Sequence, residues 1–133
     1  MARFMLFIHP GASAGELAEG PTLEAVEAMN RYNEELAKAG ALLAVDGLRP
    51  EATRVSASGV TDGPFSEAKE LVGGYWIIQA KDRDEALEWA RRVPQDANSF
   101  VEVRQIYELS DFSEDIEEAA TLSTGEPPHQ TKG

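Results

Sequence analysis

Residues 73–90, GGYWIIQAKDRDEALEWA, decide the fold because they contain a strand followed directly by a helix. Aromatic and β-branched side chains dominate residues 75–80 after two glycines, which indicates a buried strand. Asp82 then stands at a helix N-cap position with Glu85 three residues later, the pattern of a capping box. Pro94 ends the helix. The apolar face of this helix consists of Ala86, Leu87, Ala90 and Val93.

A similar strand and helix open the chain. Residues 3–9 form an apolar run bounded by Pro10, which predicts a first strand. Residues 10–21 are rich in glycine and small side chains, which is typical of a loop. Thr22 is the expected N-cap of an amphipathic helix that ends before Gly40. The apolar stripe of this helix consists of Val26, Met29, Tyr32 and Leu36.

Two more strands, over residues 41–45 and 100–107, complete the pattern. This order predicts an α+β domain with a ferredoxin-like β-α-β-β-α-β unit, in which both helices cover one face of an antiparallel sheet. Strands 3–9 and 75–80 are apolar on both faces, so the second face needs a cover. A second copy of the chain is the simplest cover. We therefore expect a homodimer.

An insert separates the two halves of the domain and spans residues 50–70. Residues 54–58 suit a small edge strand, since Val55 is their only large apolar residue. The sequence Asp-Gly-Pro-Phe at 62–65 carries turn signals, and residues 66–70 suit one helical turn. We expect a β-hairpin or loop at this insert.

The charge of the chain is strongly acidic, with 24 acidic and 12 basic side chains and a net charge of -12. Without a basic block, such a chain is not expected to bind nucleic acid directly. Residues 108–133 hold seven of the acids and a single lysine. We therefore divide the chain into a domain over residues 1–109 and an acidic, partly disordered tail over residues 110–133.

Several chemistries are excluded by composition. The chain has no cysteine, which excludes disulfides and thiol nucleophiles. Because it has only two histidines, we expect no histidine-rich metal site, and no motif requires a cofactor. The apolar run over residues 4–8 is too short for a signal peptide or a membrane span. We expect a cytoplasmic protein without membrane contact.

Several motifs together resemble the YCII-related proteins, in particular the branch that contains an Asp-Gly-Pro-Phe motif. They cover residues 62–65, 67–70 and 73–76, with further support at 4–6, 47–50, 85–90 and 101–104. The resemblance extends over residues 3–112 and implies a dimeric α+β barrel, but no particular reaction. Smaller relatives carry a histidine–aspartate pair with the histidine on the first helix. Here that helix offers Asn30, Tyr32 and Asn33, so the pair is not carried over.

Glu102 and Arg104 are candidate ligand-binding residues. They lie two positions apart on a predicted strand, so both point away from the side of Val101 and Val103. On the face that a second copy would close over, Arg104 suits a carboxylate or phosphate ligand. Glu102 is then either a partner that orients Arg104 or a base. Alternatively, the two residues form an ion pair with each other or across the dimer interface.

Three further residues complete the candidate site. Asp62 is either a general base presented by the turn or a residue that shapes the turn through backbone amides. His9 shares a strand face with Met5 and Phe7, and is either a proton-transfer residue in the cavity or bonded to a loop carbonyl. Lys69 either lines the mouth of the same pocket as a ligand-binding residue or is a surface lysine.

Two functions fit these features. In the first, a small-molecule-binding protein or enzyme acts on a small organic acid in the barrel by acid–base chemistry, an expectation that rests on analogy between folds. Arg104 would then hold the anion, with Asp62 or His9 as the base. In the second, a regulatory protein linked to transcription through sigma-factor-like partners uses the tail as an arm that folds on binding. The tail could equally pack over the second subunit and strengthen the dimer.

Overall fold

The computed structural model describes residues 1–12, 14–17, 19–62 and 71–120. Its strands are β1 (Ala2–His9), β2 (Leu42–Gly47), β3 (Thr53–Ser56), β4 (Gly59–Asp62), β5 (Gly74–Ala80) and β6 (Phe100–Gln105). Its helices are α1 (Ala14–Leu17), α2 (Leu23–Lys38), α3 (Arg83–Arg91) and α4 (Glu114–Ala120), with the 3-10 turn η2 (Leu109–Asp111) before α4.

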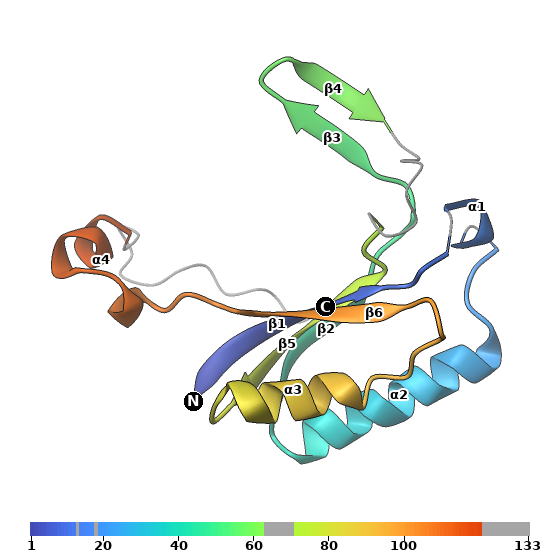
Figure 1. Ribbon diagram of the computed structural model, residues 1–133, viewed down its shortest axis with the longest axis horizontal. Helices are drawn as coiled ribbons and strands as arrows, with labels where there is room; N and C mark the ends of the chain where they lie inside the picture. The colour runs from blue at the N-terminus through green and yellow to red at the C-terminus, as the bar shows by residue number, and fades with distance from the viewer. Residues whose placement is uncertain (13, 18, 63–70, 121–133) are drawn as a thin grey trace.

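The main sheet has four strands in the order β2-β5-β1-β6, and every neighbouring pair is antiparallel. Helices α2 and α3 lie against the same face of this sheet (Figure 1). This order and layering confirm the expected ferredoxin-like α+β fold. We call the other face, which no described helix covers, the open face.

The core lies between the sheet and the two helices. Its largest fully buried side chains are Phe4, Leu6, Leu36 and Ile78. The Tyr32 hydroxyl on α2 donates a hydrogen bond to the carbonyl of Trp89 at 2.7 Å, and burial raises the pKa of the Tyr32 phenol above its ordinary range. Trp76 Nε1 donates to Asn33 Oδ1 at 2.7 Å. The polar tips of these aromatic residues are therefore satisfied inside the core.

Both predicted helix starts are confirmed. Thr22 Oγ1 accepts a hydrogen bond from the amide of Ala25 at 3.1 Å, and Asp82 Oδ1 accepts from the amide of Glu85 at 2.9 Å. The apolar stripe of α2, however, packs only from Met29 onward, because Met29 lies against the core whereas Val26 remains 48% exposed. The first turn of α2 thus lies beyond the packed core.

The adjacent glycines Gly73 and Gly74 allow the backbone at the start of β5 to approach the end of β1 and the end of β2 closely. A Cβ atom at Gly74 would lie 2.8 Å from the carbonyl oxygen of Asp46 on β2. The amide of Gly73 donates to the carbonyl of Ile8 at 2.7 Å, and its own carbonyl accepts from the amide of Leu48 at 2.9 Å. Only glycine leaves room for this junction of three segments.

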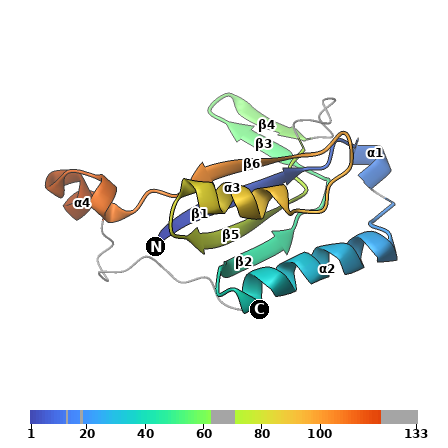
Figure 2. The same ribbon diagram turned by 60° about the horizontal axis from the view of Figure 1, so that its bottom comes forward.

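The insert folds as a hairpin outside the main sheet. β3 and β4 pair only with each other, and every residue from 51 to 62 is exposed. The hairpin projects on the side of the sheet opposite α2 and α3 (Figures 1 and 2). The hairpin expected at this insert is therefore confirmed. The sequence placed only its first strand, because the short Gly-Val-Thr-Asp run of β4 has too little alternation to reveal a strand.

Of three further segments, one differs from the sequence expectation, one agrees with it and one lies outside the described residues. The loop expected over residues 10–21 contains α1, a single turn too short for hydrophobic periodicity to detect. The helical turn expected near Ile116 is confirmed as α4. The turn expected over residues 66–70 lies outside the described residues.

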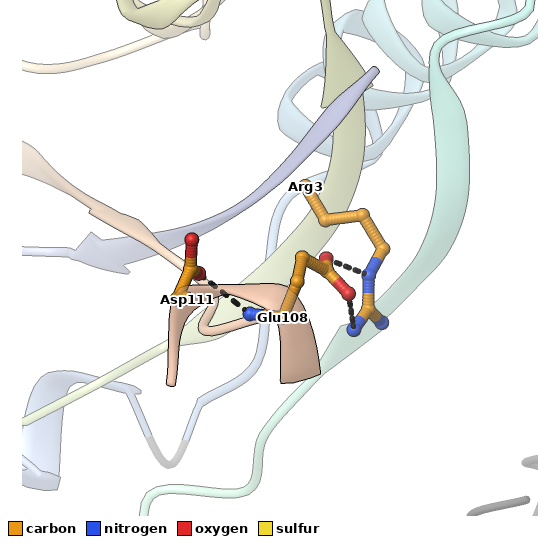
Figure 3. A network of polar contacts seen from close by, with 3 residues as sticks. All are labelled: Arg3, Glu108 and Asp111. Atoms are coloured by element: carbon orange, nitrogen blue, oxygen red, sulfur yellow. Dashed lines mark hydrogen bonds and ion pairs between the residues drawn. The ribbon is translucent and has the colours of Figure 1, made fainter. Parts of the chain in front are cut away.

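The start of the acidic segment is tied to the sheet by one side-chain pair. Arg3 on β1 donates to both carboxylate oxygens of Glu108 at 2.7 and 3.2 Å (Figure 3). The hydrogen bond to Glu108 raises the pKa of the Arg3 guanidinium. The amide of Glu108 donates to Asp111 Oδ2 at 2.8 Å, which begins η2. No helix of the described ranges is long and apolar enough to cross a membrane.

Candidate functional site

The open face of the sheet has an apolar centre and charged edges. Residues directly opposite one another on antiparallel strands share a face. Phe7 on β1 lies opposite Tyr75 on β5 and Glu102 on β6, and Tyr75 lies opposite Asp46 on β2. The next row across the sheet consists of Ala44, Ile77, Met5 and Arg104. Aromatic and aliphatic side chains thus occupy the two central strands, with ionisable groups on the edge strands.

His9 lies at the end of β1 and is packed tightly at the margin of this face. Its residue surface is only 9% exposed. The imidazole stacks on the ring of Phe100 with a centroid distance of 4.3 Å and an interplanar angle of 9°. His9 Nε2 lies 3.6 Å from Glu102 Oε1, a distance for an ion pair rather than a hydrogen bond. The stack and the carboxylate together hold the imidazole in one orientation.

Arg104 points to the same face but forms no ion pair with Glu102. Among the described residues, Glu102 has its ion pair with His9, and Arg104 has no salt bridge to another described side chain. The mutual Glu102–Arg104 pair that the spacing allowed is therefore not formed within the described part of the chain. Arg104 is exposed on the edge strand β6 beside Met5.

Asp46 and Tyr75 are residues of this face that sequence reasoning missed. The Tyr75 hydroxyl donates a hydrogen bond to Asp46 Oδ2 at 3.1 Å. We predicted that the second strand ends at Val45 because Asp-Gly resembles a turn, whereas β2 continues to Gly47. The alternation of Ala44, Val45 and Asp46 was the available signal, since it places Asp46 opposite the core side.

Asp62 and Lys69 are not brought to the open face by the described structure. Asp62 lies on the exposed hairpin, where its Oδ1 accepts a hydrogen bond from Thr53 Oγ1 at 2.8 Å. This contact closes the open end of the hairpin, on a different element from His9 and Glu102. Lys69 lies outside the described residues. The catalytic role of Asp62 and the ligand-binding role of Lys69 stay predictions.

A separate cleft of about 670 Å³ lies at the end of the sheet on the helix side. Its apolar lining includes Ile8, Leu17, Met29 and Leu48, and Arg49 and Glu51 also line it. The volume is sufficient for a small ligand. Sequence reasoning missed this cleft because it forms only where α1, the start of α2 and the segment after β2 come together.

No metal centre is present within the described ranges. Nowhere in them do three histidine, aspartate or glutamate side chains gather closely enough to hold an ion. The arrangement on the open face instead suits an organic anion, because it combines a guanidinium, a histidine–carboxylate pair and an apolar floor.

Comparison with known proteins identifies the family of the chain. A search of curated protein sequences returned no match. The family model of the YCII-related domain matches residues 2–110. The matched span runs from β1 through β6 and includes His9, Asp62, Glu102 and Arg104, whereas α4 lies beyond it. Since the match covers most of the 133 residues, the chain belongs to the YCII-related family.

Proposed function

We propose that this protein forms a homodimer through the open face and binds a small organic acid in the space between the two sheets. The observation that carries the proposal is the guanidinium of Arg104, which has no salt bridge to another described residue. In a chain of net charge -12, a cation of this kind beside an apolar surface favours an anionic ligand.

The composition of the open face supports self-association. Met5, Phe7 and Ile77 are each partly exposed and form an apolar strip across the two central strands, on the face that no described helix covers. An uncovered strip of this kind is typical of an interface. The edges carry both signs of charge, with Glu102 and Arg104 two residues apart. A face that carries both acids and bases is able to pair with a second copy of itself across a two-fold axis.

The pair of His9 and Glu102 supports acid–base chemistry on the bound acid. An imidazole with a carboxylate 3.6 Å away is an arrangement suited to proton transfer. Arg104 lies opposite Met5, four residues along β1 from His9, and Glu102 lies opposite Phe7 between them, so an acid held by Arg104 reaches the imidazole if it extends past Glu102. In this proposal Arg104 anchors the carboxylate of the ligand, and His9 exchanges a proton with it.

The test is a thermal-shift screen against small mono- and dicarboxylic acids, hydroxy acids, lactones and inorganic phosphate. A ligand present at about a hundred times its Kd stabilises the protein by about 2.7 kcal/mol, which raises Tm by a few degrees. We expect Arg104→Ala to abolish this shift. Arg83→Ala is the matched control, because it removes the same charge from α3 on the other side of the sheet.

Calorimetry of the best ligand then tests the histidine. Titrations in two buffers of different ionisation enthalpy measure the protons taken up on binding, and His9→Gln is expected to remove that uptake while leaving binding. The proposal is wrong if the screen yields no ligand, or if Arg104→Ala and Arg83→Ala bind equally well. Proton uptake that persists in His9→Gln would exclude His9 as the proton-transfer group.

A further inference from the structure

We propose that the β3–β4 hairpin is an intersubunit arm, whose Val55–Val60 face packs against a second copy of the chain. This inference rests on the proposed homodimer and adds a contact to it that the open face alone does not supply. Every residue of the hairpin is exposed, and the hairpin carries the apolar pair that a partner would cover.

The hairpin is well formed although nothing described covers it. Thr53 bonds to Asp62 at one end, and at the other Ser56 Oγ donates to the carbonyl of Gly59 at 3.3 Å. Every residue from 51 to 62 is exposed nevertheless. An isolated two-stranded hairpin is at best marginally stable in water. A partner surface would supply the burial that this hairpin lacks.

The two faces of the hairpin differ in chemistry. Val55 and Val60 lie directly opposite each other, and they are 76% and 66% exposed. Arg54 and Thr61 are the next pair and point to the other face. One face is therefore an apolar pair and the other is polar, which is the pattern of a strand pair that packs on one side.

The position of the hairpin favours a second copy of the chain as the partner that covers Val55 and Val60. It projects on the side of the main sheet that lacks α2 and α3, the same side as the open face (Figures 1 and 2). Sheets that pack face to face lie about 10 Å apart, and a four-residue strand spans about 13 Å. A copy placed on the open face is thus within reach of the arm. Acidic Glu51 and Asp62 flank the hairpin, which disfavours nucleic acid as the occupant.

Neighbouring substitutions on β4 test the arm. Val60→Asp places a charge on the apolar face, and Thr61→Asp places the same charge one residue later on the polar face. Analytical ultracentrifugation measures the dimer Kd of each variant. We expect Val60→Asp to weaken the dimer at least about tenfold, as loss of a buried valine contact predicts. Thr61→Asp is expected to stay close to wild type.

Photo-crosslinking gives a second readout, because it reports whether Val60 lies next to the second chain. Because the chain has no cysteine, Val60→Cys introduces a unique attachment site for a benzophenone maleimide. Irradiation is expected to give a product with the mass of two chains on a denaturing gel. Glu27→Cys, on the exposed side of α2, is the control and is expected to give only the single-chain mass.

The outcomes separate this inference from the proposed function. A dimeric wild type with equal Kd values for Val60→Asp and Thr61→Asp, and no two-chain product from Val60→Cys, overturns the arm and leaves the homodimer standing. A wild type that is monomeric at every concentration overturns both. A selective loss of affinity in Val60→Asp together with the two-chain product supports the arm.

Discussion

Arg3 and Glu108, which lie 105 residues apart in the sequence, are joined by two hydrogen bonds at 2.7 and 3.2 Å (Figure 3). Their side chains remain 42% and 39% exposed, so solvent screens the pair. Its effect on global stability is therefore expected to be below about 1 kcal/mol. Its main consequence is local, because it fastens the beginning of the acidic segment to β1.

Arg3→Gln is therefore expected to release the segment after β6 while barely changing Tm. Chymotryptic cleavage at Phe112 should become faster, because cleavage requires local detachment of the chain. Mass spectrometry of the early digestion products measures the rate. Arg104→Gln is the matched control, since it removes the same charge from a residue without a described salt bridge. Equal cleavage rates in the two variants would show that the Arg3–Glu108 pair does not anchor the segment.

Tyr32 is expected to make the folded state sensitive to alkaline pH. Burial raises the pKa of its phenol in the folded protein, whereas the unfolded chain titrates near the ordinary value of about 10. Above that pH the unfolded state loses its proton first, so the free energy of unfolding falls as pH rises. Below about pH 10, the contribution of protonated Tyr32 to the free energy of unfolding is fully present.

Tyr32→Phe should flatten this alkaline decline and, at neutral pH, cost about 1 kcal/mol through the lost hydrogen bond to the Trp89 carbonyl. Urea unfolding at neutral pH and above about pH 10 measures both effects. Tyr107→Phe, at a residue that is 73% exposed, should keep the wild-type decline. A Tyr32→Phe protein with the full wild-type decline would contradict the assignment.

Gly74 and Gly47 face each other across β5 and β2 and offer a comparison at one register position. A methyl group at Gly74 would lie 2.8 Å from the backbone oxygen of Asp46, whereas at Gly47 the nearest atom is 3.9 Å away. Gly74→Ala must therefore displace β2 and should destabilise by about 1–3 kcal/mol. Gly47→Ala should change stability by less than about 0.5 kcal/mol. Similar midpoints of urea unfolding for the two variants would refute the close approach.

Leu36 and Val26 belong to the same apolar stripe of α2 but differ in burial. Leu36 has no exposed surface, and Val26 is 48% exposed. Leu36→Ala is expected to cost about 2–5 kcal/mol, because it leaves a cavity in the core. Val26→Ala should cost less than about 1 kcal/mol. Chemical denaturation compares the two variants, and equal losses of stability would mean that the first turn of α2 is packed as tightly as the rest of the helix.

The correct predictions from sequence rest on local chemistry. Thr22 and Asp82 cap helices because a short polar side chain satisfies amides two or three residues ahead. The apolar run at 75–80 forms a strand whose alternate side chains enter the core. Such signals act over a few residues, so periodicity and capping residues were sufficient to place the helices and strands of the two halves.

Errors in the sequence reading occurred where short segments carry weak signals. β4 has four residues and one large apolar side chain, and α1 is a single turn. The extension of β2 through Asp46 was hidden because Asp-Gly is more typical of a turn. Pairing with β5 overrides that preference, since it satisfies the backbone groups of Asp46 and Gly47.

By itself the sequence determined the ferredoxin-like order of elements, the caps of α2 and α3, and the shared side of Glu102 and Arg104. Only the tertiary structure decided which groups meet. Glu102 approaches His9 rather than Arg104 because the register of β1 against β6 joins segments more than 90 residues apart. Asp62 is separated from them because the insert pairs with itself. Periodicity tells which side a residue faces, whereas register and packing between distant segments determine its neighbours.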